Sequence, residues 1–258
     1  MNQEKMDDIL VPLFGTLVGS FLNVVIYRLP RGESLVFPAS HCPSCNHPID
    51  FYDNIPILSW LFLRGKCRYC KERISFQYPV VEASSGLLWS GLLSTFGLTP
   101  TFFYWVFFVS VMMVIFWIDL HHQLILDETT FFGITLGILY HVVEAGEAVE
   151  SIVGALVGYL LFLGIEKGSF LLFKKPGLGR GDAKLSALMG AWLGFPMLWV
   201  ALFLSFLLGS MVGMGIFIKN NFKSRYFPFG PAMVTAGILV LFFGPTLLSA
   251  YLHFVMIL

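Results

Sequence analysis

Long stretches without a charged residue dominate this chain, and they leave it few ways to fold. Hydrophobic residues make up 57% of the 258 positions and charged residues only 12%, whereas soluble domains carry about 25% charged residues. We therefore predict an all-α polytopic membrane protein with about eight transmembrane helices, some shorter than the roughly 20 residues that an upright helix needs. The uncharged runs are Ile9–Tyr27, Ala83–Pro100, Thr101–Ile118, Thr129–Val143, Ser151–Ile165, Leu185–Phe195, Pro196–Ile218 and one within Phe227–Leu258.

The basic residues predict the orientation of these helices. Of 16 Lys and Arg residues, only Lys5 and Lys167 lie outside three clusters, which are Arg28–Arg73, Lys174–Lys184 and Lys219–Arg225. Cytoplasmic loops of membrane proteins carry an excess of Lys and Arg. Eight helices with the N-terminus outside place all three clusters in the cytoplasm. A seven-helix alternative, in which the weakest run merges with its neighbour, moves the last cluster outside, so we prefer eight.

The spacing of the runs also predicts the domain organisation. We expect residues 1–27 to form the first transmembrane helix, 28–82 a small cytoplasmic loop domain, and 83–258 the membrane core. The N-terminus lacks the basic segment and small-residue cleavage site of a signal peptide, so we expect no cleaved leader. The formal net charge is zero, which gives no bulk attraction to nucleic acid. Membrane lipid is the expected environment.

All four cysteines lie in the predicted cytoplasmic loop as two CxxC pairs, which are Cys42 with Cys45 and Cys67 with Cys70. The 21 residues between the pairs are close to the spacing of zinc ribbons with four thiolate ligands. A metal would stabilise a segment that is too small to form a large core. Two disulfides or four free thiols are the alternatives, and a cytoplasmic location disfavours disulfides. We predict a structural zinc ion in a zinc-ribbon-like domain.

Two aspartates occupy the boundaries of apolar runs. Asp119 follows the run that ends at Ile118, and Asp182 follows Gly179-Arg180-Gly181 before the run that starts at Leu185. Charge at a membrane boundary is costly, which favours a functional role. The predicted topology places both carboxylates at the cytoplasmic face. One ionised and one protonated carboxyl group can together activate water for peptide hydrolysis, and the glycines would leave room for an extended substrate strand.

Structural and non-catalytic interpretations compete with this hypothesis. Asp182 is a good N-cap residue for a helix, and Asp127 beside Glu128 is well explained as the N-cap of the next helix, although it could also support the site. A proton-coupled transporter would spread its acids through the depth of the membrane. A non-catalytic assembly scaffold organised by the metal loop would tolerate the loss of both Asp119 and Asp182.

Several longer segments resemble the type IV prepilin leader peptidases, which are membrane aspartic proteases of the GxGD class. The resemblance covers roughly residues 12 to 235. The segments that carry it are Gly19-Ser20-Phe21-Leu22-Asn23-Val24-Val25-Ile26-Tyr27-Arg28-Leu29-Pro30, the two CxxC pairs, Asp53-Asn54-Ile55-Pro56-Ile57-Leu58-Ser59-Trp60, Tyr78-Pro79-Val80-Val81-Glu82, Ile118-Asp119-Leu120, Gly179-Arg180-Gly181-Asp182-Ala183-Lys184 and Pro228-Phe229-Gly230-Pro231.

This resemblance implies a bacterial inner-membrane enzyme that cleaves the basic leader of type IV prepilins or type II secretion pseudopilins on the cytoplasmic side. Asp119 and Asp182 match the two catalytic aspartates of the family. Members that have the cysteine loop often also methylate the new N-terminus with S-adenosylmethionine, and Glu82 is a candidate for recognising the substrate amine. Pairing of Glu82 with Arg28 or Lys184 is an equal alternative for its role.

The supporting or substrate-binding candidates of the site are Gly179, Gly181, Asp127, Lys184 and Glu82. One position departs from the family pattern, because Leu126 stands where the family usually has a proline. No glycine-rich fingerprint of soluble methyltransferases is present in the sequence, so methylation is implied by the resemblance alone.

Overall fold

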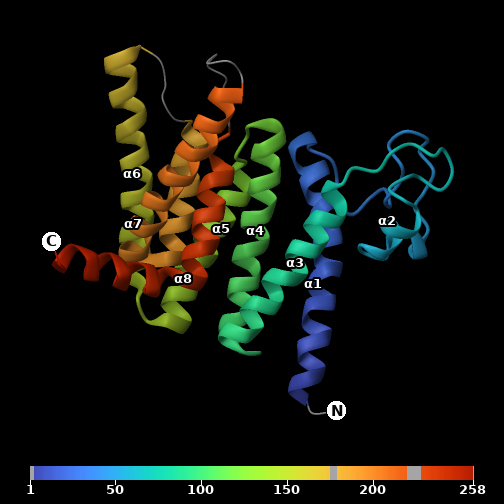
Figure 1. Cartoon of the computed structure of the whole chain (residues 1–258), viewed down its shortest axis with the longest axis horizontal. Coiled ribbons are helices and arrows are strands. Elements are labelled where there is room, and N and C mark those ends of the chain that lie inside the picture. The colour runs from blue at the N-terminus through green and yellow to red at the C-terminus, as the bar shows by residue number, and fades with distance from the viewer. Residues whose placement is uncertain (1–2, 175–178, 220–227, 258) are drawn as a thin grey trace. The chain divides into compact units, whose positions relative to one another are not determined.

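The computed structural model describes residues 3–174, 179–219 and 228–257 of the chain. These residues form helices and loops, and their only β-type pairings are two isolated bridges in the cysteine loop. The chain divides into two compact units, Met1–Val114 and Ile115–Leu258, which are described separately (Figure 1). Lys175 of the second basic cluster, and Lys223 and Arg225 of the third, lie outside the described residues.

Five helices are long and apolar enough to cross a membrane. They cover Glu4–Arg31, Pro100–His122, Ala148–Leu172, Arg180–Lys219 and Gly230–Ala250. A polytopic membrane protein is therefore consistent with the structure, whereas the expected number of eight transmembrane helices is not confirmed. Three of the predicted runs lie in helices that are shorter, more polar or merged with a neighbour, and each of these is described below.

The first unit is built on α1 (Gln3–Arg28) and α3 (Gln77–Phe96), which pack closely together. A Cβ atom on Gly19 would lie 2.8 Å from Glu82 Cα, and one on Gly86 would lie 2.8 Å from the Thr16 side chain. Glycine therefore allows the two backbones to approach. The first part of α4 (Pro100–His122) joins this unit, where the rings of Trp89 and Phe102 pack edge to face.

The segment between α1 and α3 is mostly loop. It contains the short helices η1 (Leu29–Arg31), η2 (Phe51–Asn54) and α2 (Leu58–Phe62). Helix α1 ends before Pro30, which lacks the backbone N–H that a continuing helix needs. Gly97 ends α3 with a left-handed φ of 61°, a conformation that glycine adopts without strain. The four cysteines lie in this loop segment.

The second unit contains the last turns of α4, followed by α5 (Asp127–Tyr140), the π-helical turn η3 (His141–Ala145), α6 (Ala148–Phe173), α7 (Arg180–Lys219) and α8 (Gly230–Ile257). Helix α5 has only 14 residues, so it is about 21 Å long. The helices α6 and α7 are in direct contact, because a Cβ atom on Gly154 would lie 2.5 Å from the Gly190 carbonyl oxygen.

Helix α7 consists of two arms that meet at Gly194, whose φ of 75° and ψ of 168° are not helical. Ser186 in the first arm lies against Gly158 of α6, and Phe206 in the second arm stacks on Phe162, one turn further along α6. In a straight helix, residues 186 and 206 would be about 30 Å apart. Both arms therefore extend in the same direction from Gly194, and the chain reverses there.

Side chains from neighbouring helices satisfy the backbone at this reversal. Gly194 breaks the helix and Pro196 has no N–H, so the carbonyls of Ala191 and Trp192 lose their usual helical donors. Ser151 Oγ donates to the Ala191 carbonyl at 2.7 Å, and His141 Nε2 lies 3.0 Å from the Trp192 carbonyl. These buried hydrogen bonds from side chains thus replace the missing backbone hydrogen bonds and stabilise the turn.

Candidate active site and metal centre

Asp119 lies in the last turn of α4 and is 5% exposed. Its Oδ2 accepts a hydrogen bond of 2.9 Å from the backbone N–H of Gly230, the first residue of α8. A Cβ atom at position 230 would overlap the Asp119 carboxylate, so glycine is required for this contact. Gly230 lies in one of the segments that carry the family resemblance, but the sequence does not predict its contact with Asp119, because the two residues are 111 positions apart and no local pattern links them.

Asp182 lies in the first turn of α7 and is half-buried. Its Oδ2 accepts a hydrogen bond from the N–H of Gly179 at 3.0 Å, and its own N–H donates to the Gly179 carbonyl at 3.1 Å. This is one of the two contacts of a capping box, in which the side chain of the third helical residue accepts a hydrogen bond from the backbone N–H of the residue before the helix. Asp182 is therefore not the N-cap that we considered, because it is the third residue of α7, and its carboxyl group instead accepts the N–H of the residue before the helix.

The two aspartates share the second unit, and Gly181, which precedes Asp182, packs against Ile125 in the segment that follows Asp119. The glycines before Asp182 serve this approach in different ways. A Cβ atom on Gly181 would lie 3.0 Å from the Ile125 side chain, whereas one on Gly179 would contact only Gly181 and the Asp182 carboxylate. Gly181 thus lets the segment that follows α4 pack close to the first turn of α7.

An ion pair joins Lys184 in the first turns of α7 to Asp127 at the start of α5. The expectation that Asp127 is an N-cap is wrong in detail. Leu126 precedes the helix, Asp127 is its first residue, and neither side chain caps the backbone. Acidic residues in a first helical turn still interact favourably with the helix dipole. The contact links the start of α5 to the first turns of α7, two residues after Asp182.

The four cysteine sulfur atoms lie within 4.8 Å of one another, so the cysteines could hold a metal ion. Cys42 Sγ and Cys70 Sγ are 3.8 Å apart, which is too long for a disulfide and equals the spacing of roughly 3.8 Å between sulfurs bound tetrahedrally at 2.3 Å from zinc. Each CxxC pair sits on a tight turn that ends in a residue with positive φ, Asn46 or Lys71. Backbone N–H groups of Cys70 and Tyr69 lower the pKa of Cys67 to about 7, which favours a thiolate.

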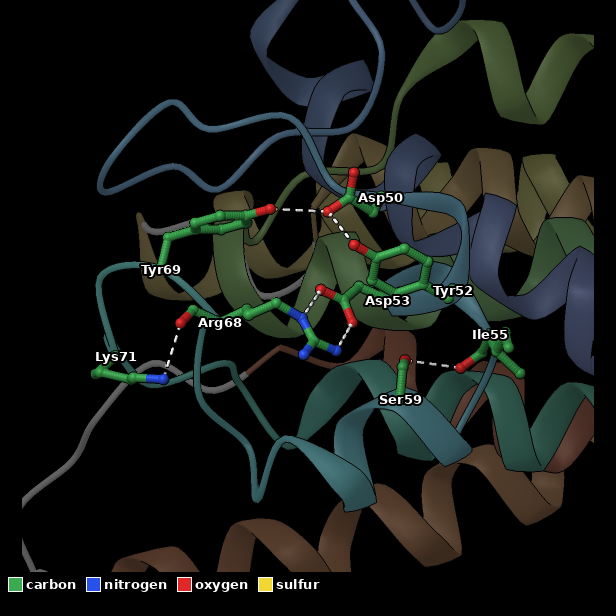
Figure 2. Close-up of polar contacts among 8 residues, drawn as sticks. All are labelled: Asp50, Tyr52, Asp53, Ile55, Ser59, Arg68, Tyr69 and Lys71. Carbon is green, nitrogen blue, oxygen red and sulfur yellow. Dashed lines mark hydrogen bonds and ion pairs between the residues drawn. The ribbon is translucent and has the colours of Figure 1, made fainter.

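Polar side chains at 50–53, for which the sequence predicts no role in the metal centre, bind the second CxxC turn (Figure 2). Asp53 forms a two-pronged ion pair with Arg68, at 2.7 and 2.5 Å. Asp50 Oδ2 accepts hydrogen bonds from the hydroxyls of Tyr52 and Tyr69, at 2.8 and 2.9 Å, and these bonds lower the pKa of Asp50. Arg68 and Tyr69 are the two middle residues of the second CxxC pair, so the segment at 50–53 is held against the second CxxC turn.

Glu82 belongs to the first unit and lies on α3, where it is 6% exposed. The pairing with Arg28 or Lys184 that we considered for Glu82 is not the one that forms. Its Oε2 accepts the backbone N–H of Ile57 at 2.7 Å, and it also hydrogen-bonds to Ser20. The Arg28 guanidinium instead binds the carbonyls of Ser34 and Pro38.

A helical protein with membrane-length helices, a pair of aspartates in one unit and a separate four-cysteine loop defines a restricted class of polytopic membrane protein. Residues 13–96 match the bacterial peptidase A24 N-terminal domain, and residues 106–214 match the type IV leader peptidase family. The chain belongs to the type IV leader peptidase family. No solved structure matches it.

Proteins named prepilin leader peptidase/N-methyltransferase are similar to the chain along almost its whole length. The one from Aeromonas hydrophila is 38% identical, over 94% of this chain and 93% of its own. The one from Stutzerimonas stutzeri is 35% identical over 94% and 92%, and the one from Legionella pneumophila is 33% identical over 95% and 94%. The resemblance found in the sequence is thereby confirmed.

Proposed function

We propose that this protein is a membrane aspartic endopeptidase that removes the basic leader of type IV prepilins or type II secretion pseudopilins. The observation that carries the proposal is the pair Asp119 and Asp182, which lie in one unit and each accept a hydrogen bond from a glycine amide, although 62 residues separate them in the sequence. The family to which the chain belongs, and the names of its relatives, supply the substrate class.

The two carboxyl groups perform complementary roles in this proposal. One is ionised and takes a proton from water, while the other is protonated and donates to the carbonyl oxygen of the scissile peptide bond. Two neighbouring carboxyl groups do not both ionise readily, which maintains the asymmetry. The Gly230 amide orients Asp119 and the Gly179 amide orients Asp182, so both oxygens are positioned before the substrate binds.

The orientation and the loop complete the proposal. The excess of Lys and Arg in the loops favours a cytoplasmic site in a multi-pass protein of the bacterial inner membrane. The four cysteines hold a structural zinc ion, and since four protein ligands leave no open position, this ion stabilises the loop and takes no part in the hydrolysis. The chain also methylates the newly exposed N-terminus with S-adenosylmethionine, as the names of its relatives imply.

Replacement of each aspartate tests the peptidase. We expect Asp119→Asn and Asp182→Asn, in purified full-length protein, to lower leader cleavage of a prepilin by at least about 10³-fold, because each group is essential to the water activation. Mass spectrometry of the product N-terminus measures both cleavage and methylation. Glu144→Gln, an exposed carboxylate-to-amide change in η3, is the matched control. Full cleavage by either aspartate variant would indicate a scaffold or a transporter in place of a protease.

A further inference from the structure

Three of the segments that carry the family resemblance play no part in the aspartate chemistry, yet they meet in the first unit. They are residues 19–30 on α1, 53–60 in the loop and 78–82 on α3. Gly19 lies against the Glu82 backbone, Ser20 hydrogen-bonds to Glu82, and Glu82 accepts the N–H of Ile57. One buried carboxyl group thus connects all three segments.

The backbone at this junction is strained. Ile57 has φ 63° and ψ −52°, which a β-branched residue adopts only at a cost of about 1–3 kcal/mol. The hydrogen bond to Glu82 holds the Ile57 N–H in this conformation. Strain that is maintained by a buried acid is more typical of a functional site than of a connecting loop.

A cavity of about 280 Å³ opens beside this junction, between one face of α1 and the loop at 35–40. This volume is near the lower end of the range, about 300–1,000 Å³, of small-molecule pockets. Apolar side chains of α1 form one wall, and they include Phe21 and Val24. The polar residues that line the cavity are Ser20, Arg28, Ser40 and Asn54.

Arg28 is the distinctive group of this cavity. It is 6% exposed, and no carboxylate of the described residues forms an ion pair with it. Its guanidinium donates to the carbonyls of Ser34 and Pro38, at 2.9 and 2.8 Å. Three of its five N–H groups are not used by these two hydrogen bonds. A buried cation without an anion is costly, and an anionic group bound in the cavity would offset that cost.

We propose that this cavity is the S-adenosylmethionine site of the methylation, an inference that rests on the proposed function. Arg28 would bind the carboxylate of the cofactor, and the polar groups of Ser20, Ser40 and Asn54 suit its ribose hydroxyls and amino group. The apolar wall of α1 suits its flat base.

A phospholipid is the main competing ligand, because the cavity lies at the end of a membrane-length helix. One feature favours the cofactor. The loop at 34–38 covers one side of the guanidinium through two backbone hydrogen bonds, so a ligand reaches Arg28 from the cavity.

The test is equilibrium binding of S-adenosylmethionine to the purified full-length protein, without any substrate. We expect Arg28→Gln to weaken binding by about 10- to 100-fold, the effect of losing charged hydrogen bonds, and Arg28→Lys to weaken it less. Arg31→Gln, three residues away and exposed, is the matched control and should bind normally. Photo-crosslinking of labelled cofactor to the unmodified protein, with peptide mapping, should label residues 17–40 or 54.

Each outcome supports or overturns a defined statement. If the unmodified protein does not bind S-adenosylmethionine, the methylation proposal itself fails together with this inference. If the protein binds the cofactor but Arg28→Gln binds equally well, or the label maps elsewhere, only the location is wrong. If Arg28→Gln loses co-purifying phospholipid and keeps cofactor binding, the cavity is a lipid site and the inference is overturned.

Discussion

At the scale of single residues, the geometry of Asp119 depends on a glycine in another helix. We predict that Gly230→Ala lowers leader cleavage by about 10- to 100-fold, because the added methyl group overlaps the carboxylate and a misplaced catalytic group costs about this much. Steady-state cleavage of a prepilin by the purified variant measures the effect. Gly164→Ala, where an added methyl group meets nothing within 4 Å, should cleave at the normal rate.

The ion pair between Arg68 and Asp53 leads to a second prediction at the scale of single residues. In metal-bound protein, Arg68→Gln should speed the release of the ion to a chelator by about fivefold, since a two-pronged pair between a guanidinium and a carboxylate is lost. A colorimetric zinc indicator follows the release. Lys66→Gln removes a nearby exposed charge and should leave the rate unchanged, so an equal effect in both variants would contradict a specific role for the pair.

Not all residue roles could be predicted from the sequence. The spacing of the two CxxC pairs was sufficient to predict that four sulfurs converge, because a CxxC turn is a local structure. The contacts of Gly230 with Asp119 and of Glu82 with Ile57 join residues that are distant in the sequence. Nothing in the composition near either partner specifies them, so only the folded chain reveals them.

At the scale of helices, α6 and α7 approach through facing glycines. We predict that Gly190→Ala destabilises the protein by about 1–3 kcal/mol, because the new methyl group would overlap the Gly154 backbone and overpacking costs this much. Thermal unfolding in detergent, followed by circular dichroism, measures the change. Gly168→Ala, which meets no atom within 4 Å, should unfold at an unchanged or slightly higher temperature.

The helices also show where sequence patterns lose information. The uncharged runs located the long helices, because length and hydrophobicity are local properties. The reversal within helix α7 was harder to predict, since its two arms have similar composition and only Gly194 and Pro196 interrupt them. The capping of its turn by Ser151 and His141 depends on packing against other helices and has no counterpart in the sequence around the turn.

At the scale of the whole molecule, the loop of the first unit has little regular structure and should depend on its metal. We predict about one zinc ion per chain by mass spectrometry of metals, and about four newly reactive thiols after chelation. Because metal binding and folding of such segments are coupled, chelation should make residues 32–76 sensitive to protease while the helices stay intact. Protection that survives complete metal removal would contradict a structural ion.

The reversal at Gly194 determines how deep Asp182 lies if the turn is placed at one surface of the bilayer. The first arm, residues 180–193, is about 14 residues and therefore about 21 Å long, whereas the hydrocarbon layer is about 30 Å thick. If its turn lies at one surface of the hydrocarbon layer, this arm ends about 10 Å short of the opposite surface. Asp182 would then lie beneath the headgroups, where water must enter a local depression, and a substrate helix could present its cleavage site without leaving the bilayer.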